Sequence, residues 1–389
     1  MINPQDIIEK YTVEELNETA EKYFSAIEDP TYLLAKPLNN FIETPKLLEN
    51  VGLLLAGTKL TKSMTVLDFA SGTCWLSYFL NQLQCKTISC DVSQTALDIG
   101  KRYFEFYPLV NPPVAEPQFL LFDGVTIDLP DNSVDRIICN DGFHHIPNQK
   151  VVLAEFSRIL RDGGIVGFSE PGRYHSQTPQ SQHEMQHYTV LENDILLNDV
   201  YEIAQSVGFT NIVIKMVGDL DFSLREYNFF THPRMIKLAS RFFPRIVGPL
   251  LNKSIFFLSK GEMVHDSRGH IGLSHEMTAE KSAYSAKVDE VISIPLTIKN
   301  TGHSIWLNEN YVDIGIVKIG SHLLAESGEF LKMDFTRDVI SRTVRPGETL
   351  QQSVQVSFPE KGVYSLSLDL LSEQVVWFGL TGSKTAVVT

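Results

Sequence analysis

Short apolar segments alternate with longer amphipathic segments over the middle of the chain. The short segments, each bounded by turn residues, predict β-strands at 65–69, 86–91, 118–123, 135–140, 164–170, 210–217 and 254–260. The longer ones carry apolar residues at three- and four-residue spacing and predict helices at 75–84, 94–105, 151–160 and 199–207. Strands and helices that alternate in this way favour right-handed crossovers. The pattern therefore predicts an α/β fold with a doubly wound, seven-stranded, mostly parallel sheet.

The two ends of the chain have different patterns. Residues 1–60 show helical spacing interrupted by Pro30, Pro37 and Pro45, which predicts a helical N-terminal cap. Alternating apolar residues at 291–300, 311–319, 351–358 and 363–370, separated by turn sequences, predict an all-β, immunoglobulin-like sandwich. We therefore expect a cap at 1–60, a main domain at 61–264 with an insertion or lid at 219–251, a linker at 265–284 and a β-sandwich at 285–389.

Composition narrows the class of partner. A formal charge of -14 over 389 residues disfavours nucleic acid and anionic lipid surfaces, so we expect a small-molecule or glycan substrate. No segment is long and apolar enough to predict a membrane span, and the first residues lack the features of a signal peptide. The four cysteines show no CxxC spacing, which favours a reducing, cytoplasmic location. The pattern favours no particular oligomeric state.

The segment VLDFASGTCW, residues 66–75, follows the first predicted strand. Its small residues Ala70, Ser71 and Gly72 allow a tight turn and close approach of a ligand, and the next helix begins with free N–H groups. Such a turn suits an adenosine or phosphate group. Asp91 ends the second strand, where a carboxylate can accept hydrogen bonds from both ribose hydroxyls, and Asp123 with Gly124 ends the third.

These segments, in this order, resemble the Rossmann-like class I S-adenosylmethionine-dependent methyltransferases over roughly 46–261. CNDGFHHIPN (139–148) and FSRILRDGGIVGFSEPG (156–172) are similar to the family's segments around its fourth and fifth strands. The resemblance implies S-adenosylmethionine as cofactor, with these binding residues: Asp68, Ala70, Ser71, Gly72, Cys74, Trp75, Asp91, Val92, Asp123, Gly124, Asn140 and Asp141. Ala70 and Cys74 replace the family's first and third loop glycines. Alanine is tolerated at the first position if its φ is negative, and we expect Cys74 to narrow the space beside the methionine moiety.

Histidines supply the candidate chemistry. A hydroxyl acceptor needs a base, and His144 or His145, after the fourth strand, can serve, with Glu170 of the fifth strand orienting one of them. A polar stretch follows, from which His175, His187 and Tyr188 are candidate substrate contacts. His183 and His187 share a helix face if that stretch is helical, but without a third ligand we expect exposed histidines and no metal site.

The second domain bears on the acceptor. Its pattern of short alternating strands and turns resembles that of β-sandwich modules in bacterial surface-glycan enzymes. This resemblance favours O-methylation of a sugar or glycan intermediate. A natural product or other small metabolite is the alternative acceptor. Two further alternatives are a nicotinamide-dependent oxidoreductase, which the loop and Asp91 alone would allow, and a non-catalytic cofactor-binding scaffold.

Overall fold

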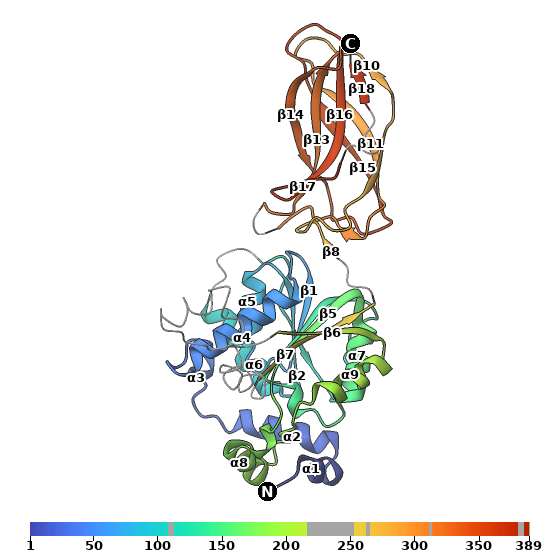
Figure 1. Cartoon of the computed structure of the whole chain (residues 1–389). Helices are drawn as coiled ribbons and strands as arrows, with labels where there is room; N and C mark the ends of the chain where they lie inside the picture. The colour runs from blue at the N-terminus through green and yellow to red at the C-terminus, as the bar shows by residue number, and fades with distance from the viewer. Residues whose placement is uncertain (108–112, 216–252, 262–264, 311–312, 380–384, 389) are drawn as a thin grey trace, which may run out of the picture. The chain divides into compact units, whose positions relative to one another are not determined.

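A seven-stranded sheet forms the centre of the first of two units, Met1–Met263, in the computed structural model (Figure 1). Its strands are β1 (Thr65–Phe69), β2 (Lys86–Asp91), β3 (Gln118–Leu121), β4 (Val134–Asn140), β5 (Leu160–Pro171), β6 (Phe209–Lys215) and β7 (Lys253–Lys260). Their order is β3-β2-β1-β4-β5-β7-β6, and β7 runs antiparallel to both of its neighbours while the other pairs are parallel. The predicted seven-stranded, mostly parallel sheet is confirmed.

The structure describes residues 1–107, 113–215, 253–261, 265–310, 313–379 and 385–388. The predicted insertion or lid at 219–251 lies outside these residues. Among the described residues, no helix has the length and apolar character needed to cross a membrane.

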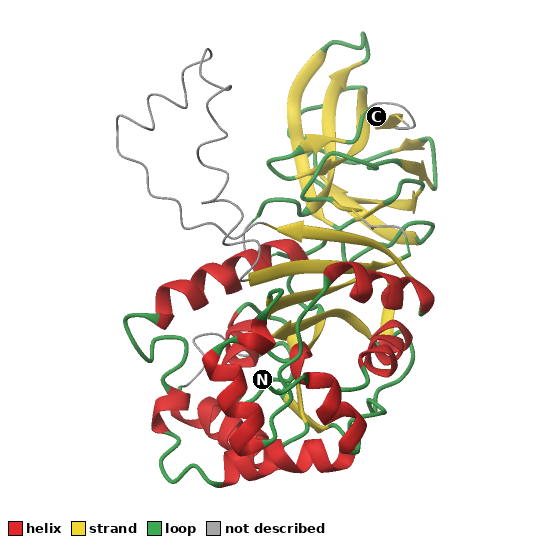
Figure 2. Cartoon of the chain, turned by 60° about the horizontal axis from the view of Figure 1, so that its bottom comes forward, coloured by secondary structure: helices red, strands yellow, loops and turns green. Residues whose placement is uncertain are grey.

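Helices cover both faces of the sheet, as Figure 2 shows. One apolar cluster joins alternate strand residues such as Val66 to α4 (Glu43–Thr58), α5 (Trp75–Gln82) and α6 (Gln94–Phe106). The intervening residues, such as Leu67, pack with α7 (Gln149–Ile159) and α9 (Leu197–Ser206). Strand side chains alternate between faces, so a strand covered on both sides reads as a continuous apolar run. This explains why the short apolar segments predicted the strands well.

A layer of N-terminal and mid-chain helices lies at the carboxyl ends of the strands. It contains α1 (Pro4–Lys10), α2 (Val13–Ser25) and α8 (Pro179–Tyr188), with short 3₁₀ helices at Phe143–His145 and His175–Gln177. Helix α3 (Thr31–Leu34) instead packs through Leu34 in the cluster of α4, α5 and α6. A capping box begins α2: Thr12 Oγ1 accepts from the Glu15 N–H, and the Glu15 carboxylate accepts from the Thr12 N–H. Leu16 of α2 and Met185 of α8 pack in one apolar cluster. Segments far apart in sequence thus enclose one end of the sheet.

The second unit, Val264–Thr389, is all β. Its strands are β8 (His265–Asp266), β9 (His275–Ala279), β10 (Ala283–Tyr284), β11 (Ile292–Asn300), β12 (Ser304–Ile305), β13 (Val317–Ala325), β14 (Phe330–Val339), β15 (Thr349–Val356), β16 (Tyr364–Ser372), β17 (Val376–Trp377) and β18 (Thr385–Val388). One sheet has the order β10-β18-β16-β13-β14, a second has β15-β11-β9, and inward residues of both, such as Ile294 and Leu368, share a core. The prediction of a C-terminal all-β region with antiparallel sheets is confirmed.

Two details of this unit differ from expectation. Residues 265–284, predicted as a linker, contain β8, β9 and β10, and β9 pairs with β11. The alternation in HEMTA is too short to predict a strand alone, and its pairing with β11 stabilises it. The sequence also did not predict β14, because most of its residues are exposed and it therefore lacks a clear apolar face.

Candidate cofactor and active site

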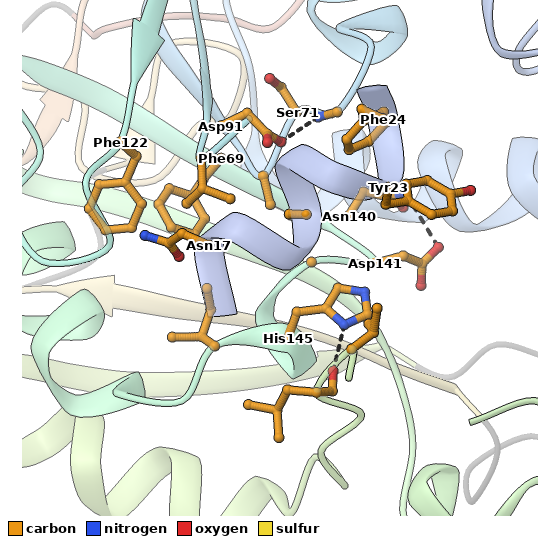
Figure 3. Close-up of a pocket in the computed structure, with 18 of the residues that line it drawn as sticks. Asn17, Tyr23, Phe24, Phe69, Ser71, Asp91, Phe122, Asn140, Asp141 and His145 are labelled. Atoms are coloured by element: carbon orange, nitrogen blue, oxygen red, sulfur yellow. Dashed lines mark hydrogen bonds between the residues drawn. The ribbon is translucent and has the colours of Figure 1, made fainter. Parts of the chain in front are cut away.

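A cavity of about 430 Å³ opens at the carboxyl ends of β1, β2 and β4 and lies under α2 (Figure 3). Of the predicted site residues, these line it: Asp68, Ala70, Ser71, Gly72, Trp75, Asp91, Val92, Gly124, Asn140, Asp141 and His145. The others do not line it: Cys74, Asp123, His144, Glu170, His175, His187 and Tyr188. The structure thus brings together most of the predicted cofactor residues and one of the two histidines.

The loop between β1 and α5 adopts left-handed backbone at three places: φ is 54° at Ala70, 51° at Gly72 and 58° at Cys74. The condition of a negative φ at Ala70 is therefore not met. Left-handed backbone costs a residue with a Cβ roughly 1–2 kcal/mol, and hydrogen bonds hold the loop in this form. The Ser71 N–H donates to the Cys90 carbonyl at 3.1 Å, and the Gly72 N–H donates to Asp91 Oδ2 at 2.7 Å.

Cys74 is fully buried and does not narrow the cavity, contrary to expectation. Its side chain occupies the space above Gly100 of α6, where an added Cβ would lie 2.3 Å from Cys74 Sγ. A glycine on the neighbouring helix thus accommodates the thiol where the resembled family has a loop glycine. The loop keeps its course, and the thiol faces away from the cavity.

Two buried carboxyl groups support this loop. Asp91 accepts from the N–H groups of Gly72 (2.7 Å) and Ser93 (2.9 Å), and burial raises the pKa of its carboxyl. Asp68 Oδ2 accepts from Ser77 Oγ at 2.6 Å, and burial raises the pKa of Asp68 to about 7. Both side chains reach the cavity from the ends of adjacent strands.

Asp123 departs from the prediction. Its side chain is exposed, and Oδ1 accepts from the N–H groups of Val125 and Thr126, each at 2.7 Å. Aspartate commonly caps a turn in this way. Phe122 and Gly124 on either side line the cavity in its place.

Helix α2 forms a wall of the cavity and is attached to the sheet layer. Glu21 accepts from Ser93 Oγ at 2.6 Å and from Thr95 Oγ1 at 2.5 Å. Burial opposes ionisation of Glu21, but these hydrogen bonds outweigh it and lower its pKa to about 2. Asn17 Nδ2 donates to the Asp123 carbonyl at 2.9 Å. Hydrogen bonds to the Glu21 carboxylate and from the Asn17 amide thus keep α2 over the cavity.

Glu170 organises the turn that follows β4. Its carboxylate is fully buried and accepts from the N–H groups of Gly142 (3.1 Å) and Phe143 (3.0 Å) and from His144 Nδ1 (2.7 Å). Burial opposes the charges of both groups, but their mutual hydrogen bond lowers the pKa of Glu170 and raises that of His144. Glu170 thus holds His144, and not His145, and both residues lie behind the cavity wall.

His145 is the histidine that faces the cavity. Its Nδ1–H donates to the Leu191 carbonyl at 2.7 Å, which leaves Nε2 with its lone pair (Figure 3). Enclosure by the cavity walls, and then the neighbouring His144, lower the pKa of His145 to about 4. The ring is therefore neutral at neutral pH and offers a hydrogen-bond acceptor.

Glu192 lines the cavity; it belongs to the polar stretch after the fifth strand but was not among the candidate substrate contacts chosen from it. Its Oε1 lies 3.7 Å from His145 Nδ1, and its Oε2 accepts from His175 Nε2 at 2.5 Å. His175, predicted as a substrate contact, supports Glu192 instead. His187 and Tyr188 are exposed on α8, and His187 stacks on the exposed His183. The sequence signal for Glu192 was its place in that polar stretch, which did not distinguish it from the neighbouring polar residues.

One group among the described residues has the composition of a metal site. Ring nitrogens of His144 and His145 and a carboxylate oxygen of Glu192 lie within 4.8 Å of one another. This group does not include His183 or His187, the pair weighed from the sequence.

The fold and the site together define a class. The mostly parallel seven-stranded sheet, the tight loop after β1 and the acid at the end of β2 agree with the resemblance to Rossmann-like methyltransferases seen in the sequence. Residues 67–168 match the family described as methyltransferase domain. Over this stretch the chain is thus similar to methyltransferases, and the oxidoreductase alternative is left without support.

Curated relatives differ in the acceptor that they methylate. The chain is 29% identical over 136 residues to malonyl-[acyl-carrier protein] O-methyltransferase from Hamiltonella defensa subsp. Acyrthosiphon pisum, covering 35% of this chain and 49% of that one. It is 27% identical over 119 residues to the ubiquinone/menaquinone biosynthesis C-methyltransferase UbiE from Coxiella burnetii, covering 29% and 46%. The chain thus spans about half the length of these relatives. Geranyl diphosphate C-methyltransferase from Streptomyces coelicolor A3(2) aligns with a TM-score of 0.45 at 11% identity, covering 63% of this chain and 98% of that one.

Proposed function

We propose that this protein transfers a methyl group from S-adenosylmethionine to an oxygen of a sugar or glycan intermediate. The single observation that carries the proposal is the cavity itself. It joins the β1 loop and Asp91, which suit an adenosyl group, to His145 and Glu192, which suit a polar acceptor. A small metabolite is the alternative acceptor, since relatives of the domain act on chemically different ones.

The residues present fit the cofactor. A cavity of about 430 Å³ lies within the range of about 300–1,000 Å³ common for small-molecule sites. Asp91 keeps lone pairs for two ribose hydroxyls after accepting from Gly72 and Ser93, because a carboxylate accepts about four hydrogen bonds. Asp68 and Asp141 also line the cavity, where their carboxyl groups can accept hydrogen bonds from the cofactor. When bound, S-adenosylmethionine supplies an electrophilic methyl group.

His145, His144 and Glu170 form the proposed catalytic group. His145 Nε2 receives the proton of the acceptor hydroxyl, while the Leu191 carbonyl holds the ring through Nδ1. His144 and Glu170 do not line the cavity, and they act as positioning residues that fix the turn carrying His145. Their contribution is to keep the base in line with the acceptor.

Incubation with methyl-labelled S-adenosylmethionine and fractionated cell extract tests the proposal. The expected result is a labelled, carbohydrate-containing product whose formation requires the protein. A parallel titration should show binding of S-adenosylhomocysteine and none of NAD. Absence of S-adenosylhomocysteine binding would refute the proposal, and binding without any labelled product would support the scaffold alternative.

A cytoplasmic location stays a prediction. The four cysteines are unpaired and buried, which agrees with a reducing compartment.

A further inference from the structure

We infer that Glu192 binds a second hydroxyl of the acceptor, next to the one that is methylated, so that the site selects an uncharged vicinal diol. This inference rests on the proposed function and goes beyond it by naming the group that the acceptor must carry. Three observations support it: the atoms left open at His145 and Glu192, their spacing, and the charge of the cavity.

The open atoms are all hydrogen-bond acceptors. His145 donates its Nδ1–H to the Leu191 carbonyl, so its Nε2 offers a lone pair to the molecule that is methylated. Glu192 Oε2 accepts from His175 (2.5 Å) and Ser181 Oγ (3.4 Å), whereas Oε1 accepts from none of the described residues. Glu192 is 6% exposed and lines the cavity, so Oε1 is available there to accept a hydrogen bond from a bound molecule. A hydroxyl provides that donor; a carboxylate or phosphate does not.

The two groups are side by side. Glu192 Oε1 lies 3.7 Å from Nδ1 of the His145 ring, and both residues line the cavity, so the carboxylate and the imidazole are neighbours there. Hydroxyls on adjacent carbons suit two adjacent acceptors. An isolated hydroxyl would satisfy one of them and leave the other without a partner.

The charge of the cavity disfavours an anionic acceptor. Its described lining contains five carboxyl groups, those of Asp68, Asp91, Asp141, Glu184 and Glu192, against one lysine, Lys36. Lys253, outside that lining, pairs with Asp141. An anionic acceptor would enter a cavity of its own sign, which disfavours carboxylate and phosphate groups near His145.

The reaction then balances with the diol bound at both groups. The bond between sulfur and methyl breaks with its electron pair remaining on sulfur, and the acceptor oxygen forms the new bond to the methyl carbon. The proton of that oxygen passes to His145 Nε2. The neighbouring hydroxyl keeps its proton, which it donates to Glu192 Oε1.

Product chemistry provides the first test. The full chain is incubated with methyl-labelled S-adenosylmethionine and extract that has been treated with periodate, which cleaves vicinal diols, or mock-treated. We expect label only in the mock-treated sample, in an alkali-stable methyl ether. An alkali-labile methyl ester, a C- or N-methyl product, or labelling unaffected by periodate would overturn the inference but leave methyl transfer intact. Absence of all label would overturn the proposed function itself.

A variant provides the second test. With the purified acceptor, Glu192→Gln should lower kcat/KM about 10- to 100-fold, the loss of a hydrogen bond to a charged group, mainly through KM. Removal of the neighbouring hydroxyl from the acceptor should cost the wild-type protein the same factor and cost Glu192→Gln nothing further. Glu202→Gln, an exposed glutamate on α9, is the matched control. Affinity for S-adenosylhomocysteine should stay within twofold in both variants, which separates acceptor binding from a folding defect.

Two results would overturn the inference at this stage. One is an equal, additive loss for the deoxy acceptor in both proteins. The other is loss of wild-type activity in EDTA with recovery on adding a divalent cation, which would assign His144, His145 and Glu192 to ion binding.

Discussion

Asp91 allows the sharpest test of the cofactor site, because its carboxylate has both a structural and a binding role. It accepts from two backbone N–H groups, and it is 7% exposed at the cavity wall. Two ribose hydroxyls bound to a carboxylate contribute about 1.5–3 kcal/mol each. At 1.36 kcal/mol per tenfold change, Asp91→Ala should weaken S-adenosylhomocysteine binding about 100- to 10,000-fold.

The assay is isothermal titration of the ligand-free protein with S-adenosylhomocysteine. Because Asp91→Ala also leaves the Gly72 and Ser93 N–H groups without this acceptor, Asp91→Asn serves as a second variant that keeps one oxygen and should show an intermediate loss. Asp123→Ala is the control, since that exposed carboxylate caps its own turn, and its affinity should stay within about threefold of wild type. Unchanged affinity in Asp91→Ala, or an equal loss in Asp123→Ala, would refute the ribose assignment.

Three further predictions concern the same unit. The folded-state pKa of Asp68, about 7, lies above its ordinary value of 3.8, so the free energy of unfolding of the ligand-free protein should fall by up to about 4 kcal/mol as pH rises from 4 to 7. Asp68→Asn should remove this pH dependence, as measured by urea unfolding. The same pH dependence in the variant would contradict the assignment. Gly100→Ala should destabilise the protein by about 1–3 kcal/mol, because the added methyl group would contact Cys74 Sγ. In thermal unfolding, Cys74→Gly in the same chain should recover most of the lost stability. Additive losses from the two substitutions would argue against the contact. His145→Ala should lower turnover about 100-fold or more and leave the affinity for S-adenosylhomocysteine unchanged. Because the base must be unprotonated, protonation of His145 should lower the wild-type kcat/KM only as pH approaches 4. Unchanged turnover in the variant would exclude His145 as the base.

The sheet could be predicted from the sequence because its strands are buried on both faces. Their apolar runs are continuous and end at turn residues, so β1 and β2 were predicted to the residue. The strand β14 and the strands at 265–284 were missed, because exposed or very short strands lack such runs and depend on their partners. The apolar pattern thus predicts an element only where the fold buries at least one of its faces.

The site was predictable as far as the sheet determines it. Asp68 and Asp91 end adjacent parallel strands and therefore had to lie close together. Asp123 follows the third strand in the same way, but its carboxylate accepts hydrogen bonds from the N–H groups of Val125 and Thr126 in its own loop. Glu192 reaches the cavity on a segment without regular structure, so no periodicity predicts it. The compensation of Cys74 by Gly100 is a contact between separate helices that spacing does not show.

The walls of the cavity have a consequence for how this protein is compared with others. The methyltransferase match covers 67–168, whereas α2 and the segment at 180–192 enclose the cavity from outside that stretch. The matched part carries the cofactor loop and the histidine turn, and the unmatched part carries Glu192. Two chains that share the former and differ in the latter would use one methyl donor on unlike molecules, so the search for this protein's acceptor belongs with the flanking segments.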